Sequence, residues 1–492
     1  MTLESLPEFV AAIDRIGELV RIRQPVRTHL EIAEIADRAM KLPGGGPALL
    51  FERPVMPDGR ESTIPLAINL FGSHRRIRLA MGVDALDEIG DRISEMLNMK
   101  VPEGILGKLS MLPKLAEMAK FPPRTRSGRP PCQDVVLQGD AIDLDTIPFL
   151  QTWPQDGGRY ITLPMVITRD PGRGTRNVGM YRVQVQGKRE LAMHWQRHKT
   201  GAAHWREMAE RGEMMPVVIA LGGDPVSVYS GSAPLPPGID EFLFAGFIRK
   251  SPVELAKAVT CDLEVPTESE IVIEGYIDPR EPLVIEGPFG DHTGFYSLAD
   301  EYPRVHVTAV TMKKQPLYAA TLVGRPPMED FYLGHATERI FLPLLKLTVP
   351  EIVDYHMPPA GIFHNLVFVS INKQYPGQAY KVMHALWGQG LMSLSKVLII
   401  VDHDVNVQDS EEVWWVALNN IDPKRDTEFA RGPADVLDHA SQAFTFGSKM
   451  GIDATRKWPE EGFTREWPEK IVMDEATKRR IDEMWPSLGI SK

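Results

Sequence analysis

Cysteine and long apolar runs are both scarce in this sequence. Only two cysteines, Cys132 and Cys261, occur in 492 residues, and they do not form a CxxC pair. A disulfide framework or a thiolate zinc site is therefore not expected, which fits a reducing compartment. The longest purely aliphatic run, residues 397–401, falls far short of the roughly 20 residues that cross a bilayer.

Positive charge is not in excess either. The formal net charge is −11, with 55 Lys and Arg against 66 Asp and Glu. A broad basic face for nucleic acid is therefore not expected. The N-terminal segment MTLESLPEFV carries acidic residues and lacks the apolar core of a signal peptide. We expect a cytoplasmic protein of roughly three domains, at about 150 residues per domain.

The residue pattern changes twice along the chain, which predicts an α+β protein of three domains. Residues 1–121 combine helical apolar stripes with short apolar strands, so we expect an α/β domain. Residues 132–325 consist of short alternating segments, typical of a β-barrel or sandwich. Residues 331–492 contain a strand-helix-strand order, which predicts a second α/β domain. The basic, proline-rich stretch 122–131 is interpreted as a linker.

Local signals place several individual elements. Ser5 with Glu8, and Thr28 with Glu31, have the spacing of a helix capping box. We therefore expect helices to begin at both sites. The segment 317–322 is expected to add a strand to the β-rich central core.

The segment EGPFGDHTGFY, residues 286–296, carries two acids that could cooperate. Glycine and proline separate Glu286 from Asp291, and such a turn can bring both carboxylates into one small space. Close carboxylates push their pKa values apart, so one can stay protonated near neutral pH as a general acid. The alternative is a glycine turn between strands with two solvated acids.

Arg182 lies on the face of an alternating segment opposite Tyr181 and Val183. A buried arginine needs a carboxylate partner or a bound anion. If Glu286 orients Arg182, the free edge of the guanidinium could hold a substrate carboxylate as a bidentate pair. The alternative is an ordinary cross-strand ion pair.

Three further residues offer groups for a cation or a phosphate. Asn177 and Glu241 supply hard oxygen atoms, which suit Mg²⁺ or Mn²⁺ bridging to a phosphate, although most such residues lie on the surface. Lys396 opens an apolar strand, where its ammonium could reach a phosphate or extend into solvent.

Nine segments in order carry a family likeness, and they cover the chain from the first helix to about residue 468. They are RNVGMYR (176–182), PLPPGIDEFLFAG (234–246), DLEVPTESEIVIEGYI (262–277), EGPFGDHTGFY (286–296), GRPPMED (324–330), PEIVDYHMPPAG (350–361), KQYPGQA (373–379), DHDVN (402–406) and GSKMGIDATRKWP (447–459). Together they resemble the UbiD family of decarboxylases, which use prenylated FMN. Within that family the sequence is most similar to the branch that decarboxylates 4-hydroxy-3-polyprenylbenzoate in ubiquinone and menaquinone biosynthesis.

The resemblance implies specific catalytic and metal-binding residues. Arg182, Glu286 and Asp291 match the family's Arg-Glu-acid triad, with Asp291 at the position of the proton donor. Asn177 and Glu241 match ligands of the divalent metal on the cofactor phosphate, which is Mn²⁺ or Mg²⁺. K⁺ is a further candidate ion.

The third protein ligand of that metal stays open between Thr200, which aligns best, and the nearby His198. The resemblance also places a set of residues at the flavin. These are Asn177, Met180, Tyr181, Arg182, His194, Trp195, Gln196, Lys199, Thr200, Glu241 and Lys396.

The implied fold is an N-terminal α/β domain, a central flavin-binding split β-barrel and a C-terminal α/β domain that drives oligomerisation. The implied partners are an aromatic acid substrate, a flavin prenyltransferase that supplies the cofactor, and copies of the same chain in a dimer or hexamer. A lipid substrate would bring the enzyme to the inner face of the membrane. Three alternatives remain open: the carboxylation direction, a smaller hydroxybenzoate or naphthoate substrate, and a flavin-binding protein without catalysis.

Overall fold

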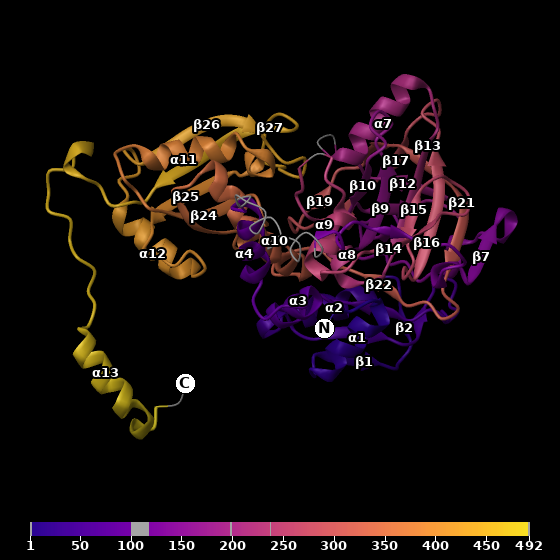
Figure 1. Cartoon of the computed structure of the whole chain (residues 1–492), viewed down its shortest axis with the longest axis horizontal. Helices are drawn as coiled ribbons and strands as arrows, with labels where there is room; N and C mark the ends of the chain where they lie inside the picture. The colour runs from indigo at the N-terminus through magenta and orange to yellow at the C-terminus, as the bar shows by residue number, and fades with distance from the viewer. Residues whose placement is uncertain (1, 100–117, 197–198, 237, 491–492) are drawn as a thin grey trace, which may run out of the picture.

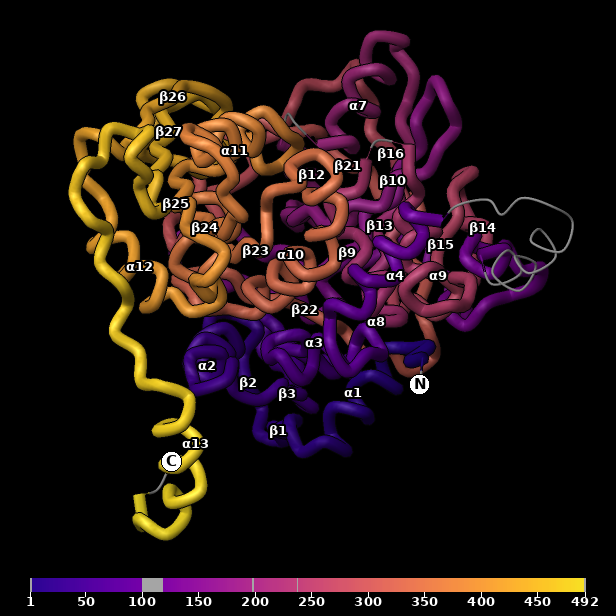
Figure 2. The backbone as a smooth tube through the Cα atoms, turned by 60° about the vertical axis from the view of Figure 1, so that its left-hand side comes forward, coloured from indigo at the N-terminus to yellow at the C-terminus, as the bar shows by residue number. Residues whose placement is uncertain are grey.

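The computed structural model describes residues 2–99, 118–196, 199–236 and 238–490. Three sheet-containing parts follow one another, and a thin C-terminal arm leaves the last of them (Figures 1 and 2). The strands and helices mix within the first and third parts, while strands dominate the second. This confirms the predicted α+β architecture.

The first part is a four-stranded sheet with helices packed on it. The strand order is β1 (Leu19–Ile22), β3 (Ala48–Phe51), β5 (Leu66–Ile68) and β22 (Tyr318–Ala320). The helices are α1 (Leu6–Arg15), α2 (Glu31–Met40), α3 (His74–Met81) and α4 (Asp87–Leu97), and β2 (Val26–Arg27) pairs with β4 (Pro54–Val55).

The first of the two predicted helix caps is confirmed and the second is wrong. Helix α1 begins directly after Ser5, whose Oγ accepts a hydrogen bond from the Glu8 N–H at 3.4 Å. Helix α2 instead begins after Leu30, which has φ 67° and gives no side-chain cap. Thr28 is not available, because its Oγ1 donates to the Val55 carbonyl at 3.2 Å. Because β2 pairs with β4, Thr28 forms its hydrogen bond with β4 and cannot cap α2.

The segment 317–322 was also expected in the wrong sheet. Its strand β22 pairs in parallel with β5, so that Tyr318 lies opposite Leu66 in the first sheet. Tyr318 is fully buried there, and its N–H donates to the Pro65 carbonyl at 3.0 Å. The chain thus returns to its N-terminal part after the barrel ends, which local alternation cannot reveal.

The second part is a nine-stranded antiparallel sheet that curls into a half-open barrel. Its order is β10 (Arg176–Gly179), β9 (Pro164–Arg169), β13 (Met215–Leu221), β16 (Ile271–Ile277), β21 (Arg304–Met312), β12 (Glu190–Met193), β11 (Val183–Val185) and β8 (Arg159–Ile161), with β7 (Val135–Gln138) on β21. Helices α7 (Thr200–Arg211), α8 (Pro225–Ser230) and α9 (Glu241–Arg249) lie beside it. A three-stranded sheet borders it, in which β14 (Glu254–Lys257) lies between β15 (Glu264–Pro266) and β6 (Arg124–Thr125). Two strand pairs also border it: β17 (Val284–Glu286) with β20 (Asp300–Tyr302), and β18 (Phe289–Gly290) with β19 (Tyr296–Ser297).

The third part is a five-stranded sheet entered through the long helix α10 (Glu329–Thr348). Its order is β23 (Ile352–His356), β24 (Leu366–Ile371), β25 (Val397–Asp402), β27 (Phe446–Asp453) and β26 (Thr427–Pro433), with α11 (Gln378–Trp387) and α12 (Ser410–Asn420) packed against it. Strands β24 and β25 are parallel and α11 connects them, which confirms the predicted strand-helix-strand unit. None of the helices in the described parts of the chain has the length and apolar content that crossing a membrane requires.

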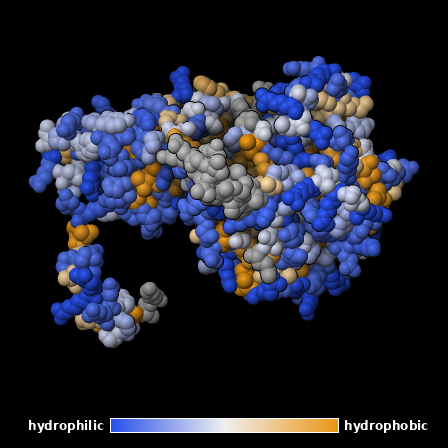
Figure 3. Space-filling model, in the orientation of Figure 1, coloured by the Kyte–Doolittle hydropathy of each residue, from blue (hydrophilic) through white to orange (hydrophobic). Residues whose placement is uncertain are grey.

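The C-terminal arm ends in helix α13 (Glu475–Met484), which buries none of its residues. Figures 1 and 2 both show the arm leading away from the third part. Figure 3 shows apolar surface at the start of the arm, where Ile471, Val472 and Met473 are exposed. The described chain does not provide α13 with the packing that normally holds a helix in place.

Glu329 joins the first part to the start of α10. Its carboxylate is fully buried and accepts hydrogen bonds from the Phe71 N–H at 2.7 Å and the Thr321 hydroxyl at 2.8 Å. Burial raises the pKa of Glu329 to about 7, although these two donors oppose the shift. The folded protein therefore binds the Glu329 proton more tightly than the unfolded chain does.

This difference in proton binding predicts a pH-dependent stability. The contribution of Glu329 is fully present below pH 4.5, declines as the pH rises towards about 7 and is constant above that. We expect Glu329→Gln to remove this decline and to unfold at a higher temperature than the wild type at pH 8. The gain can reach a few kcal/mol, since one pKa unit is worth about 1.4 kcal/mol. Equal pH dependence of thermal unfolding in both proteins from pH 5 to 8 would contradict this account.

Candidate active site

Arg182 and Glu286 form a buried bidentate ion pair at the open edge of the barrel. Arg182 directly precedes β11 and Glu286 ends β17, so the two strands fix both backbones. Arg182 Nε donates to Glu286 Oε1 at 2.9 Å, and Nη2 donates to Oε2 at 3.0 Å. Glu286 is fully buried. Two parallel hydrogen bonds fix the plane of the guanidinium as well as its position.

The other edge of Arg182 is also occupied. Its Nη1 is paired with Asp291, and Nη2 additionally donates to the Ser297 hydroxyl at 3.0 Å. The guanidinium carbon lies 4.9 Å from the centre of the Phe289 ring. The edge that the sequence analysis left free for a substrate carboxylate is therefore held by Asp291 and Ser297.

The charge on Glu286 is stabilised by two neighbours. Burial alone would raise its pKa, but hydrogen bonds from His194 and Arg182 lower it to about 2. His194 Nδ1 lies 2.9 Å from Glu286 Oε2. Burial and the nearby Arg182 charge lower the pKa of His194, so its ring is neutral and donates through Nδ1.

Asp291 is ionised in this arrangement, which corrects the expectation that its site keeps it protonated. Burial favours the neutral acid, but a hydrogen bond from His292 and the charge of Arg182 lower the pKa of Asp291 well below its usual range. His292 Nδ1 lies 2.9 Å from Asp291 Oδ1, and this contact raises the pKa of His292 against the effect of burial. Glu286 does not keep Asp291 protonated, because Arg182 lies between the two acids and forms an ion pair with each.

His292 also connects the barrel to the third part of the chain. Its Nε2 lies 3.4 Å from Nε2 of His364, whose Nε2 lies 3.8 Å from Asp435. Burial lowers the pKa of His364 to about 4, so the charge of the histidine pair resides on His292. Asp330 faces the same group, and burial raises the pKa of its carboxyl to about 6.

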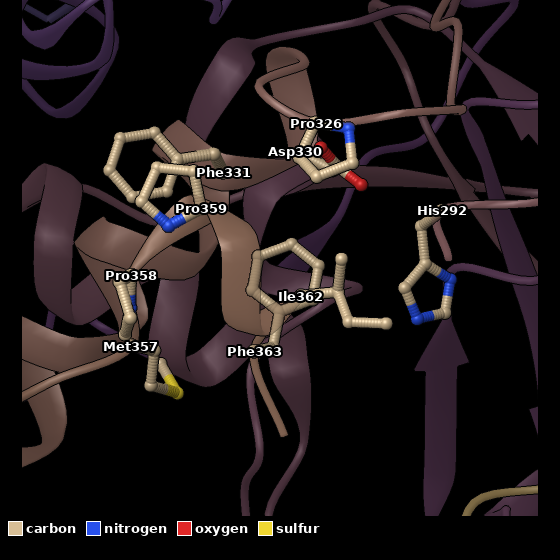
Figure 4. A pocket seen from close by; sticks show the side chains of 9 residues that line it. All are labelled: His292, Pro326, Asp330, Phe331, Met357, Pro358, Pro359, Ile362 and Phe363. Carbon is tan, nitrogen blue, oxygen red and sulfur yellow. The ribbon is translucent and has the colours of Figure 1, made fainter. Parts of the chain in front are cut away.

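A small pocket opens beside His292, and Figure 4 shows side chains from both sides pointing into it. It is lined by His292, Pro326, Asp330, Phe331, Met357, Pro358, Pro359, Ile362 and Phe363. Most of these side chains are apolar, and the free space between them is about the size of one water molecule.

The residues expected at the flavin lie next to the Arg182 cluster. The Tyr181 and Trp195 rings are 6.4 Å apart and perpendicular, and the Tyr181 hydroxyl accepts from the Gly201 N–H at 3.5 Å. Two buried nitrogen atoms, His194 Nε2 and Trp195 Nε1, have no hydrogen-bond partner within the described chain. Buried polar atoms without partners normally receive them from a ligand or water. The set therefore fits a flavin, which carries ring nitrogens and carbonyl oxygens.

Four further residues expected at the cofactor, Met180, Gln196, Lys199 and Thr200, lie close to these residues in the sequence. Met180 is partly buried, and its N–H donates to the Gly231 carbonyl at 2.8 Å. Gln196 and Lys199 are partly buried, and burial lowers the pKa of the Lys199 ammonium. Thr200 is exposed at the start of α7.

Glu241, the first residue of α9, packs against the strand β10 that carries Asn177. Glu241 Oε2 accepts from the Val178 N–H at 2.8 Å, directly next to Asn177 in the chain. Burial raises the pKa of Glu241 to about 7. A bound cation would favour the ionised form and the oxygen ligands fit Mg²⁺ or Mn²⁺. His198, the alternative third ligand, lies outside the described residues.

Lys396 lies in the third part of the chain, just before β25. Its ammonium is paired with Asp438 at 2.8 Å. Its N–H donates to the His364 carbonyl at 2.8 Å, which places Lys396 behind the histidine that faces the barrel. Lys396 thus stands at the same junction as His292, although its charge is already neutralised.

Several residues of the cluster were missed in the sequence. Ser297 and Phe289 contact Arg182, and His364 contacts His292. The segment 286–296 contains Phe289 and ends one residue before Ser297. Its two short strands, β18 and β19, could have indicated that both residues lie near the two acids. His364 lies in a separate part of the chain, and nothing local links it to residue 292.

Comparisons with known proteins identify the family of the chain. Three family models match: the N-terminal domain of 3-octaprenyl-4-hydroxybenzoate carboxy-lyase at residues 10–93, its Rift-related domain at 124–326 and its C-terminal domain at 331–454. An uncharacterized protein of Aquifex aeolicus is 53% identical over 99% of this chain and 98% of its own length.

Two solved structures show the same architecture over the whole chain. Vanillic acid decarboxylase from Sedimentibacter hydroxybenzoicus, in its closed form, matches with a TM-score of 0.84 and 26% identity over 100% of both chains. An evolved dimeric form of HmfF from Pelotomaculum thermopropionicum, in complex with prenylated FMN, matches with a TM-score of 0.78 and 28% identity over 96% and 98% of the chains. The fold and the family matches together define a carboxy-lyase. The chain belongs to the UbiD family.

The turn that carries Glu286 and Asp291 is held by a close backbone contact. The Gly157 N–H donates to the Pro288 carbonyl at 2.8 Å, and a Cβ at position 157 would lie 2.2 Å from the Gly287 carbonyl oxygen. Gln184 bridges the same two segments, since its Nε2 donates to Gly157 O at 2.8 Å and its Oε1 accepts from Gly287 N–H at 3.1 Å.

Gly157→Ala should therefore displace the turn and slow catalysis. We expect the rate of CO₂ release to fall by a factor on the order of 100, because misplacing catalytic groups by about 1 Å has effects of this size. Gly187→Ala is the matched control, since a Cβ there meets no atom closer than 3.9 Å. Similar rates in both variants would show that the contact at Gly157 does not position the acids.

Proposed function

We propose that this protein decarboxylates an aromatic acid with prenylated FMN as cofactor, and that Arg182, Glu286 and Asp291 carry the reaction. The observation that supports this most directly is the sharing of Arg182 between two carboxylates. Glu286 binds through a fixed bidentate pair, whereas Asp291 binds through one nitrogen. The two acids can therefore have separate roles.

In this proposal the substrate carboxylate takes the place of Asp291 on Arg182. The substrate forms the same kind of charge-assisted hydrogen bonds that Asp291 and Ser297 now share. Asp291 then loses Arg182, one of its two cationic partners, and stays next to a second carboxylate, and both changes raise its pKa. Substrate binding thus converts Asp291 from a carboxylate into an acid that can donate a proton.

The cofactor would be held by the His194, Trp195 and Tyr181 face, and it supplies an electron sink for the C–C bond that breaks. Glu286 keeps Arg182 in place while CO₂ leaves. Asp291 gives its proton to the carbon that carried the carboxylate, so that one acid yields one arene and one CO₂. His292, in contact with Asp291 Oδ1, can restore the proton.

Our preferred substrate is 4-hydroxy-3-polyprenylbenzoate in quinone biosynthesis. The family description names an octaprenyl-hydroxybenzoate, and the small pocket beside His292 is lined mostly by apolar side chains that a prenyl group would contact if the pocket widened. Mn²⁺ or Mg²⁺ at Asn177 and Glu241 would hold the cofactor phosphate. A flavin prenyltransferase would supply the cofactor. The exposed apolar arm 471–490 supports a homo-oligomer, a dimer or a hexamer, and a lipid substrate would bring it to the inner membrane face.

The proton-donor role predicts the behaviour of Asp291→Asn. An amide keeps the shape and can still accept from His292 but cannot donate a proton as an acid. We expect kcat to fall by about 10²–10⁴ while the flavin absorbance of the purified protein is retained. Asp300→Asn, in the exposed strand paired with Glu286, is the control and should keep wild-type turnover. Near wild-type rates for Asp291→Asn would refute the proton-donor role.

Substrate class can be tested with a series of 4-hydroxybenzoates. We expect kcat/KM to increase when a prenyl chain is added at the 3-position, by roughly tenfold for each 1.4 kcal/mol of apolar contact. Better turnover of unsubstituted hydroxybenzoate or vanillate would favour a small-acid decarboxylase. No release of CO₂ from any acid by flavin-loaded protein would favour a non-catalytic flavin-binding protein.

A further inference from the structure

Three potential metal ligands converge at the junction between α10 and β23. His335 and Glu338 lie one turn apart on α10, and His356 is the last residue of β23. One ligand atom from each residue lies within 4.8 Å of the other two. His335 Nδ1 is 3.3 Å from Glu338 Oε1, and His356 Nδ1 is 3.0 Å from Glu338 Oε2.

The 3.3 Å separation between His335 and Glu338 matches a coordination sphere, and the 3.0 Å separation between His356 and Glu338 is slightly shorter. Bonds of about 2.0–2.2 Å in tetrahedral geometry place neighbouring ligand atoms about 3.3–3.6 Å apart. A network of ordinary hydrogen bonds would explain His356, which is paired with the carboxylate. It does not explain His335, whose buried Nδ1 makes no hydrogen bond to any described residue although the carboxylate is 3.3 Å away.

Two hydrogen-bond donors orient the Glu338 carboxylate, as the outer-sphere groups at a metal site orient its ligands. Glu338 Oε1 accepts from Gln408 Nε2 at 3.0 Å, and Oε2 accepts from the Met357 N–H at 2.8 Å. Such partners orient a ligand without replacing it. Arg339 also lies 3.8 Å from Oε1, but its guanidinium binds Asp354 and Asp87 at 2.6 and 2.9 Å.

We propose that His335, Glu338 and His356 bind a divalent first-row transition metal, Zn²⁺ or Fe²⁺. Two imidazoles and one carboxylate are a ligand set that both ions accept, with further positions left for water or substrate. This site is separate from Asn177 and Glu241, which lie in the barrel part and offer oxygen ligands.

The position suggests what the ion does. It joins the helix that leaves the barrel to the edge strand of the third sheet. Phe331, one turn before His335 on α10, and Met357, directly after His356, line the pocket beside His292. The Phe331 ring lies 6.2 Å from the His335 ring in stacked orientation. A bound ion would therefore hold this wall of the pocket in place.

The experiment is elemental analysis of tag-free, flavin-loaded protein after exhaustive desalting. We expect one equivalent of zinc or iron per chain, which His335→Gln and His356→Gln should each reduce at least tenfold. His306→Gln is the matched control, because His306 forms a 2.7 Å pair with Glu281 without a third ligand among the described residues. Glu241→Gln should leave this zinc or iron in place and affect only manganese or magnesium.

Two results would overturn the proposal. One is a wild-type protein that holds no zinc or iron even after incubation with either ion. The other is a metal content that does not change in the two histidine variants. Should those variants fail to fold, anomalous scattering from wild-type crystals at the zinc and iron edges gives an independent answer. The peak must lie within about 2.3 Å of the three ligand atoms, and a peak elsewhere refutes the assignment.

Discussion

The buried guanidinium of Arg182 is the constraint on which the candidate site depends. A cation in this position requires negative partners, because an unpaired buried charge is strongly unfavourable. Glu286 and Asp291 meet this requirement, and Ser297 adds a neutral hydrogen bond, all from the two short hairpins β17–β20 and β18–β19. The loops are therefore positioned by the charge as much as by the barrel, and any anion that enters competes with an existing partner.

The site is also shared between parts of the chain. The barrel supplies Arg182 and both acids, whereas His364 and Asp435 approach from the third sheet. The charge of His292 depends on Asp291 on one side and on His364 on the other. A movement of the third part relative to the barrel would change the proton affinity of His292 without moving any residue of the barrel.

Sequence reasoning succeeded where the signal is local and failed where the partner is distant. Ser5 capped α1 because cap and helix are adjacent, and the order β24–α11–β25 followed from periodicity. The triad came from family likeness, since nothing near Arg182 in the sequence indicates Glu286. The predicted cap at Thr28 is wrong because the Thr28 hydroxyl donates to a carbonyl 27 positions away. The ionised state of Asp291 depends on Arg182, 109 positions away, and could not be read from the turn.

Strand β22 has a consequence for biosynthesis. The sheet that begins with residues 19–22 is completed only by residues 318–320. During translation at about 5–20 residues per second, strand β5 waits roughly 13–50 s before its neighbour is made. Throughout this interval one edge of the nascent N-terminal sheet is open, and an open edge pairs readily with other chains. The ribosome-bound intermediate is thus the stage at which this protein most needs protection from aggregation.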